Sequence, residues 1–232
     1  MNDTLTVDDL TLEVRRSTRR KTLEITVDRA GDLIVAAPMG LDEPTIDRFV
    51  REKRGWIYRK LAEKEMYWRP RPPRQFVTGE GFLYLGRSYR LKLVADQDCP
   101  LKVTAGRFCL KRSEVEHGRE HFVRWYTAHG QAWLSRRLLT WTRRLGVEPT
   151  GLQVRNLGHR WGSCTPAGTI NVHWTTMQLP GLIIDYVLVH ELAHLRQPDH
   201  GDAFWRLVQR ALPEYPSRRR WLAEAGHEHA GI

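Results

Sequence analysis

The run LIIDYVLVHELAHLRQPDH, residues 182–200, decides how this chain is organised. Its first half is almost wholly apolar, which is typical of a helix buried behind a sheet. His190 and His194 are four residues apart, so one helical turn brings both imidazoles to one face, where they can bind a single cation. Glu191 lies beside them, where a carboxylate can act on water at an open coordination position. Burying such groups without partners is costly, so the pattern predicts a metal site.

A third ligand is expected just beyond this helix. Pro198 stops helical hydrogen bonding and biases Gln197 toward an extended conformation, so the chain can turn back toward the metal. His200 has the best ligand chemistry after the turn, which gives H-E-x-x-H followed by a third histidine six residues later. Glu214 and Glu224 remain rivals, because the larger gluzincins take a downstream glutamate as third ligand.

This ligand set predicts a zinc-dependent hydrolase. Zinc would polarise a substrate carbonyl and acidify its bound water, and Glu191 would take the proton and later deliver it to the leaving amine. A structural zinc site would normally close its fourth position with Cys or His and would leave Glu191 without a role. A metzincin would need Gly at position 197, which is Gln, and a methionine turn, yet no methionine follows Met177.

The residues before the motif predict a small sheet and a long helix. Residues 152–156 and 169–175 have strand character and are joined by a loop. His173 shares the polar face of the second strand with Asn171 and could stabilise an oxyanion, or it could be a structural histidine with satisfied hydrogen bonds. Residues 119–145 place large apolar side chains on one helical face, opposite a row of arginines. We interpret the aromatic residues of that face as core.

The N-terminal half predicts further β structure. Residues 5–37 alternate apolar and polar side chains, as in an antiparallel meander, and a helix is expected over residues 43–66. The proline-rich stretch 68–74 cannot sustain a helix or a central strand, so it predicts a linker, and residues 76–112 predict short hairpins. We therefore divide the chain into a β-meander with a helix (1–68), a linker and hairpin region (69–118) and a catalytic domain (119–232).

Several motifs around the metal helix carry a resemblance to a known family. They are Arg160-Trp161-Gly162-Ser163-Cys164, a strand beginning at Gly168-Thr169-Ile170, the helix over 184–194, and His200 followed by Phe204-Trp205. With them the chain resembles the YgjP-like metallopeptidase family, most densely over residues 152–225.

This resemblance implies an α+β fold with an N-terminal β-rich lobe and a minigluzincin-type, zincin-like catalytic domain, in which a small antiparallel or mixed sheet is backed by the metal helix. It also implies that residues 161–175 contain an edge strand that pairs with an unfolded or extended peptide. Trp161 and Ser163, together with His173, are therefore expected to contact substrate. Binding that depends on the backbone of the peptide more than on its sequence would give broad substrate specificity.

Composition suggests a second class of partner. Lys and Arg number 37 against 27 Asp and Glu, a formal charge of +10, which favours polyanions. The arginine pairs 136–137 and 143–144 on the helix predicted over 119–145 are expected to bind nucleic acid weakly and without sequence preference, unless this face is only solvated. Two alternative functions stay open. One is a metal-dependent nucleotide phosphohydrolase (pyrophosphatase), although no glycine-rich phosphate loop is present, and the other is a nucleic-acid-associated zinc protein.

Cysteines and hydropathy indicate the compartment. Cys99, Cys109 and Cys164 form no C-x-x-C pair and leave an odd thiol in any disulfide scheme, so reduced thiols are expected. Cys164 could be a redox-sensitive or metal-capping thiol, or an inert buried one. No run approaches the ~18 consecutive apolar residues of a membrane helix, and the first residues are polar and acidic. We therefore predict a cytoplasmic protein.

Overall fold

The computed structural model describes residues 2–18, 20–27, 32–67, 73–158 and 160–232. These residues form two compact units, 1–70 and 71–232. Most of the predicted linker, residues 68–74, lies outside the described residues. Within the described part of the chain, no helix is both long and apolar enough to cross a membrane.

The first unit is a sheet with one helix. Its strands are β1 (Asn2–Val7), β2 (Leu10–Ser17), β3 (Glu24–Val27) and β4 (Leu33–Pro38), in the order β1-β2-β4-β3, followed by α1 (Glu43–Tyr67). The helix matches the prediction over 43–66, and its Ile46, Val50 and Ile57 are fully buried in the core of this unit. The prediction of an antiparallel meander over residues 5–37 is wrong in one respect. Strands β2 and β4 pair in parallel, because the short β3 pairs with the far edge of β4 instead of lying between them.

The second unit begins with a small mixed sheet. Its strands are β5 (Gly81–Tyr84), β6 (Arg87–Val94), β7 (Leu101–Thr104) and β8 (Arg107–Lys111), in the order β5-β6-β8-β7. Phe82 of β5 stacks on Phe122 of the next helix with ring centroids 4.1 Å apart, and the ring of Phe108 in β8 is 4.9 Å from that of Phe122. The region predicted as 69–118 therefore shares one hydrophobic core with the residues that follow it.

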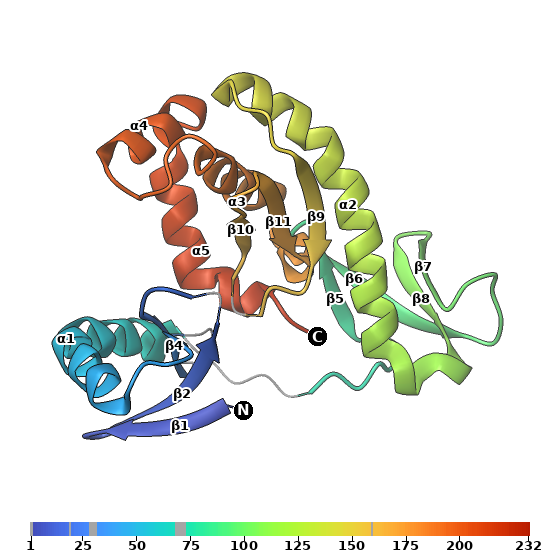
Figure 1. The fold of residues 1–232 in the computed structure, drawn as a ribbon. Helices are drawn as coiled ribbons and strands as arrows, with labels where there is room; N and C mark the ends of the chain where they lie inside the picture. The colour runs from blue at the N-terminus through green and yellow to red at the C-terminus, as the bar shows by residue number, and fades with distance from the viewer. Residues whose placement is uncertain (1, 19, 28–31, 68–72, 159) are drawn as a thin grey trace. The chain divides into compact units, whose positions relative to one another are not determined.

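The remaining elements surround the metal helix. They are η1 (Arg112–His117), α2 (Gly118–Leu145), β9 (Gly151–Arg155), β10 (Gly162–Cys164), β11 (Thr169–His173), η2 (Trp174–Gln178), α3 (Gly181–Ala193), α4 (Asp202–Ala211) and α5 (Tyr215–His229). The strands form a mixed sheet in the order β10-β11-β9, with β10 antiparallel and β9 parallel to β11. Helix α3 packs against α2, α5 and this sheet (Figure 1). The predicted α+β class, with a small mixed sheet backed by the metal helix, is confirmed.

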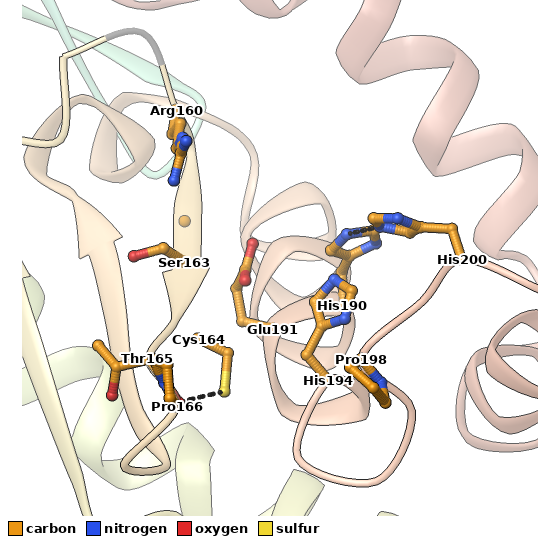
Figure 2. Close-up of a pocket in the computed structure, with 11 residues that line it drawn as sticks. Arg160, Ser163, Cys164, Thr165, Pro166, His190, Glu191, His194, Pro198 and His200 are labelled. Atoms are coloured by element: carbon orange, nitrogen blue, oxygen red, sulfur yellow. Dashed lines mark hydrogen bonds between the residues drawn. The ribbon is translucent and has the colours of Figure 1, made fainter. Parts of the chain in front are cut away.

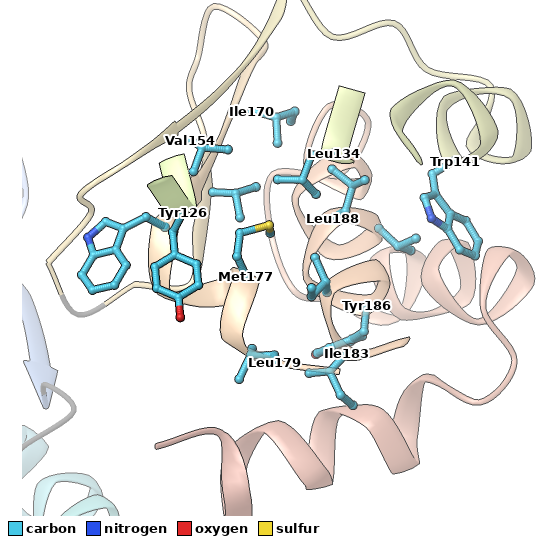
Figure 3. Close-up of a cluster of buried hydrophobic side chains, with 14 of the residues drawn as sticks. Tyr126, Leu134, Trp141, Val154, Ile170, Met177, Leu179, Ile183, Tyr186 and Leu188 are labelled. Atoms are coloured by element: carbon cyan, nitrogen blue, oxygen red, sulfur yellow. The ribbon is translucent and has the colours of Figure 1, made fainter. Parts of the chain in front are cut away.

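Helix α2 is the long amphipathic helix that the sequence predicts. Phe122, Tyr126 and Leu134 are fully buried, which confirms that its aromatic face belongs to the core. Leu134 lies in one apolar cluster with Ile170 of β11 and Met177 of η2 (Figure 3). Gly130 makes this packing possible, since a Cβ there would lie 2.7 Å from Cγ of Met177. The α2 contact thus fixes η2, which leads directly into α3.

A buried ion pair fixes α3 to α2. Asp185, 1% exposed, accepts hydrogen bonds from both Nε and Nη2 of Arg137, the Nε bond being 2.8 Å long. Its Oδ1 also accepts a bond of 3.0 Å from Nε1 of Trp141. Because Asp185 lies near the middle of α3, these bonds set the rotation and position of the helix that carries the metal motif.

Candidate metal centre

Helix α3 positions three of the predicted functional side chains. Its central residues are buried, as its apolar sequence predicts; its last turn carries His190 and Glu191, and His194 is the C-cap residue that follows. The two histidines are half-buried, with ring centroids 5.0 Å apart, whereas Glu191 is only 8% exposed. The helical spacing therefore brings the imidazoles together and places the carboxylate next to them.

The turn after α3 brings the third histidine back to this helix. Amides of Arg196 and Gln197 both donate to the carbonyl of Ala193, and the chain then reverses at Pro198. The ring centroid of His200 lies 4.9 Å from that of His190 and 4.6 Å from that of His194. Each histidine offers one nitrogen, and these nitrogens all lie within 4.8 Å of one another.

The hydrogen bonds of the cluster suit a cation ligand set. Nδ1 of His194 lies 3.0 Å from the carbonyl of Gln197; since a carbonyl only accepts, Nδ1 carries the hydrogen and Nε2 keeps its lone pair. Nε2 of His190 lies 3.0 Å from Nε2 of His200, so these two ring nitrogens are close enough to bind the same ion. The three imidazoles therefore fit one metal ion.

Burial favours the neutral form of two of these imidazoles, those of His190 and His200. It lowers the pKa of His190 to about 3, reinforced by the other two histidines. It also lowers the pKa of His200. A neutral imidazole is the form that binds a metal, so no protons have to be removed from these two side chains near neutral pH.

Glu191 is held in a confined position between α3 and β10. Burial raises the pKa of its carboxyl to about 8, opposed by the positive charge of Arg160 and by the backbone N–H of Cys164. The backbone of Gly162 approaches so closely that a Cβ there would lie 2.7 Å from Oε1 of Glu191. A cation at the histidines would favour the ionised form of this carboxyl.

An open cleft of about 540 Å³ joins these groups to β10. Figure 2 shows Glu191 between the three histidines and the opposite wall, which carries Ser163 and Cys164. Among the strands that the structure describes, β10 pairs only with β11, so it forms an edge of the sheet beside the cleft. The cleft thus combines a candidate metal site, a carboxylate and a strand edge.

The predicted substrate residues are separated by the fold. Ser163 lines the main cleft, and Trp161 lines a smaller neighbouring cavity, which Glu191 also lines. His173 is buried instead, with Nδ1 2.7 Å from Oγ1 of Thr175 and Nε2 3.0 Å from Oδ1 of Asn156. It is not among the described residues that line the cleft, and its hydrogen bonds are those of a structural histidine.

A comparison with protein families identifies the family of this chain. The model of the YgjP-like family, described as a metallopeptidase domain, matches residues 21–225. The chain belongs to the YgjP-like family. A search of curated proteins gave no match. Among solved structures, the metallopeptidase zymogen of Pyrococcus abyssi, abylysin, is similar, with 27% sequence identity, coverage of 37% of this chain and 88% of that chain, and a TM-score of 0.34.

Membership of the YgjP-like family makes this protein a metallopeptidase, and therefore a hydrolase that uses a divalent metal. In the described residues, the group of side chains that could hold such an ion is His190, His194 and His200. The rival Glu214 is exposed and forms an ion pair of 3.5 Å with Arg218, and Glu224 is exposed on α5. Neither glutamate belongs to that group.

Arg219 of this YgjP-like protein is a nearby charge that the sequence did not single out. Its guanidinium lies 4.6 Å from the ring centroid of Trp205, and its positive charge contributes to the lowered pKa of His190 and of His200. It belongs to a run of three arginines, 218–220, in which no pattern distinguishes the middle one. Only the packing of α5 reveals its place near the metal site.

The basic face of α2 is partly used inside the protein. Arg137 binds Asp185, and Arg144 donates to the carbonyl of Ala211 while its guanidinium lies over the ring of Trp141. Arg136, Arg143 and Arg144 are exposed, and of these Arg144 makes the internal contacts just described. Weak nucleic-acid binding stays a prediction that would rest mainly on Arg136 and Arg143, and its affinity should fall steeply as salt rises.

Replacing His200 by alanine should remove the metal from this YgjP-like protein. His200 supplies one of the three nitrogens that converge, and two imidazoles alone would leave a weaker site. Zinc content after dialysis, measured by atomic emission, checks this. Glu214→Ala is the matched comparison and should keep its zinc. If Glu214→Ala lost zinc and His200→Ala kept it, the ligand set would be the gluzincin type.

Gly162→Ala should slow hydrolysis about 10²-fold with the metal retained, because the new Cβ would lie 2.6 Å from Cγ of Glu191 and would displace its carboxylate. Turnover and zinc content are measured together. Gly55→Ala in α1 is the control, since a Cβ there meets nothing within 4 Å. Unchanged turnover in Gly162→Ala would show that the position of the Glu191 carboxylate does not limit the reaction.

Proposed function

We propose that this YgjP-like metallopeptidase is a zinc enzyme that hydrolyses peptide bonds of unfolded or extended protein substrates. His190, His194 and His200 would hold the zinc, and Glu191 would be the general base. The observation that carries the proposal is the convergence of three imidazole nitrogens, within 4.8 Å of one another, beside a buried carboxylate in an open cleft. Zinc is the metal that suits an all-imidazole ligand set with an open position.

The metal would supply Lewis acidity, which polarises the scissile carbonyl and makes a water molecule easier to deprotonate. Glu191 would take a proton from the attacking water and return it to the nitrogen of the leaving amine. Its position suits both transfers, because its carboxylate lies between the histidine cluster and the β10 wall of the cleft (Figure 2). Burial on α3 and the close approach of Gly162 restrict the carboxylate to this place.

An extended peptide would bind along the free edge of β10. Strand addition satisfies backbone amides and carbonyls of the edge and orients the peptide with little dependence on its sequence. Residues 162–164 form this edge, and Ser163 and Cys164 line the cleft. A peptide held there would pass beside Glu191, whose carboxylate lies close to Gly162 of β10.

The test is metal-dependent cleavage by the purified full-length chain. An unfolded protein and a peptide library are incubated with the enzyme, with the enzyme after chelation, and with the chelated enzyme after zinc is restored. Cleavage should disappear on chelation and return with zinc. Phosphate release from nucleoside triphosphates is measured in parallel. Peptide cleavage that is insensitive to chelation, or hydrolysis confined to the triphosphates, would contradict the proposal.

A further inference from the structure

A separate cavity, of about 330 Å³, lies at helix α4 and shares no lining residue with the main cleft or with the smaller cavity beside it. It is bounded by one face of α4 and by the turn that follows α3. The residues that line it are Arg196 and Gln197 of the turn and Ala203, Arg206, Leu207 and Arg210 of α4. The proposed peptide hydrolysis uses none of them.

Helical spacing explains why the α4 residues of this cavity share a face. Positions 203, 206, 207 and 210 are three or four residues apart, or one turn further on, so their side chains lie on one side of the helix. Leu207 is buried, whereas Arg206 and Arg210 are exposed. The cavity therefore combines an apolar base with two cations at the surface, and the small side chain of Ala203 leaves space between them and the turn.

The third arginine of the cavity is held from outside α4. Nη2 of Arg196 donates a hydrogen bond of 2.7 Å to the carbonyl of Gly146, the C-cap residue of α2. A bond from Arg144 to the carbonyl of Ala211 joins α2 to the end of α4. Arg196 is thus positioned before any ligand arrives, and a guanidinium has five N–H groups, so others are left for a ligand.

Acidic side chains of the protein do not balance the charge of this cavity. In the described part of the chain, no carboxylate forms an ion pair with Arg196, Arg206 or Arg210. Asp202, one turn before Arg206, is exposed in the first turn of α4, where the helix N-terminus also attracts a carboxylate. Like charges four residues apart destabilise a helix, so Arg206 and Arg210 repel each other unless an anion lies between them.

We propose that this cavity binds phosphate groups, those of a free oligophosphate or of a nucleic-acid backbone. Guanidinium groups bind phosphate oxygens through pairs of charge-assisted hydrogen bonds. Successive phosphates supply several anionic oxygens to the three guanidinium groups, whereas a carboxylate has two oxygens and pairs in this way with one guanidinium. The side-chain amide of Gln197 adds a neutral donor at the cavity. This site is independent of the proposed peptidase activity.

The experiment titrates sodium tripolyphosphate into the zinc-loaded full-length protein at low salt, followed by calorimetry. In Arg206→Gln/Arg210→Gln the affinity should fall about 10-fold or more, because two sets of charged hydrogen bonds are lost. Arg87→Gln/Arg107→Gln is the control, since both arginines are exposed on β6 and β8 and the double variant has the same net charge. It should bind nearly as the parent does. Tripolyphosphate that binds at the zinc would be affected equally in both double variants.

A second titration, with a short DNA duplex, distinguishes the two sources of phosphate. Weaker duplex binding by Arg206→Gln/Arg210→Gln than by the control would assign the site to a nucleic-acid backbone, with an affinity that falls steeply as salt rises. Weaker tripolyphosphate binding alone would assign it to a free oligophosphate. The proposal would be overturned if the parent bound neither probe, if both double variants lost affinity equally, or if an acidic peptide bound the parent more tightly than tripolyphosphate.

Discussion

Glu191→Gln is expected to fold, to keep its zinc, and to hydrolyse peptides about 10²–10⁴-fold more slowly than the parent, the range associated with loss of a general base. Glutamine keeps the size of the side chain and can still form hydrogen bonds, but it cannot accept the proton of the attacking water. The position is only 8% exposed, so the substitution leaves the surface of the protein nearly unchanged.

Other groups on the same helix are poor substitutes for Glu191. Asp185 lies more than a helical turn away and is bound to Arg137 and Trp141. Burial raises the pKa of Tyr186 to about 12, so its hydroxyl stays protonated and is a poor base near neutral pH. The proposed mechanism therefore depends on one carboxylate.

Turnover of Glu191→Gln has to be measured beside metal content. Glu120→Gln is the matched control, because Glu120 lies on the exposed surface of α2 in an ion pair with Arg124, and it should hydrolyse at the parental rate. Parental turnover in zinc-loaded Glu191→Gln would remove Glu191 from the mechanism. Loss of zinc would mean instead that the residue binds or supports the metal.

Asp185→Ala should lower the free energy of unfolding by about 3 kcal/mol, the lower end of the range for breaking a buried ion pair. The carboxylate is 1% exposed and accepts bonds from Arg137 and Trp141, and the side chain of Arg137 is 42% exposed, so part of its charge can return to water. The indole N–H of Trp141 would stay buried without its acceptor, which adds to the cost.

Urea unfolding of zinc-loaded protein, followed by circular dichroism, checks this value. The midpoint should fall while the dependence on urea stays the same. Asp98→Ala is the control in the same unit, since its ion pair with Lys102 is at the surface and should contribute little to stability. A loss in Asp185→Ala no larger than in Asp98→Ala would show that the contact does not hold α3 in place.

The sequence predicts those parts of the site that depend on local geometry. The four-residue spacing of His190 and His194, with the reversal at Pro198, is enough to predict that His200 meets them, and the structure brings the three together. The apolar face of α2 was equally predictable, because helical periodicity is a local property. In both cases the positions follow from a few neighbouring residues.

Features that depend on pairing between distant segments were not predictable in the same way. Gly162-Ser163-Cys164 has no strand pattern of its own and becomes β10 only by pairing with β11. The parallel pairing of β2 with β4 is another such case, because alternation along a strand does not specify its neighbour. The environment of His173 also depends on Asn156, which is brought to it by the sheet.

The edge strand β10 has a consequence for the behaviour of the protein in solution. An edge that can accept a peptide can also accept an extended segment of a second copy, and exposed edges are where self-association of β proteins begins. With three residues, β10 offers only a few backbone hydrogen bonds to a neighbouring strand. Its first residue is glycine, one of the poorest strand formers. The strand would thus be long enough to hold a peptide beside the proposed catalytic carboxylate, yet it is too short to hold another folded molecule firmly. Lengthening β10 to strengthen substrate binding would therefore increase self-association as well.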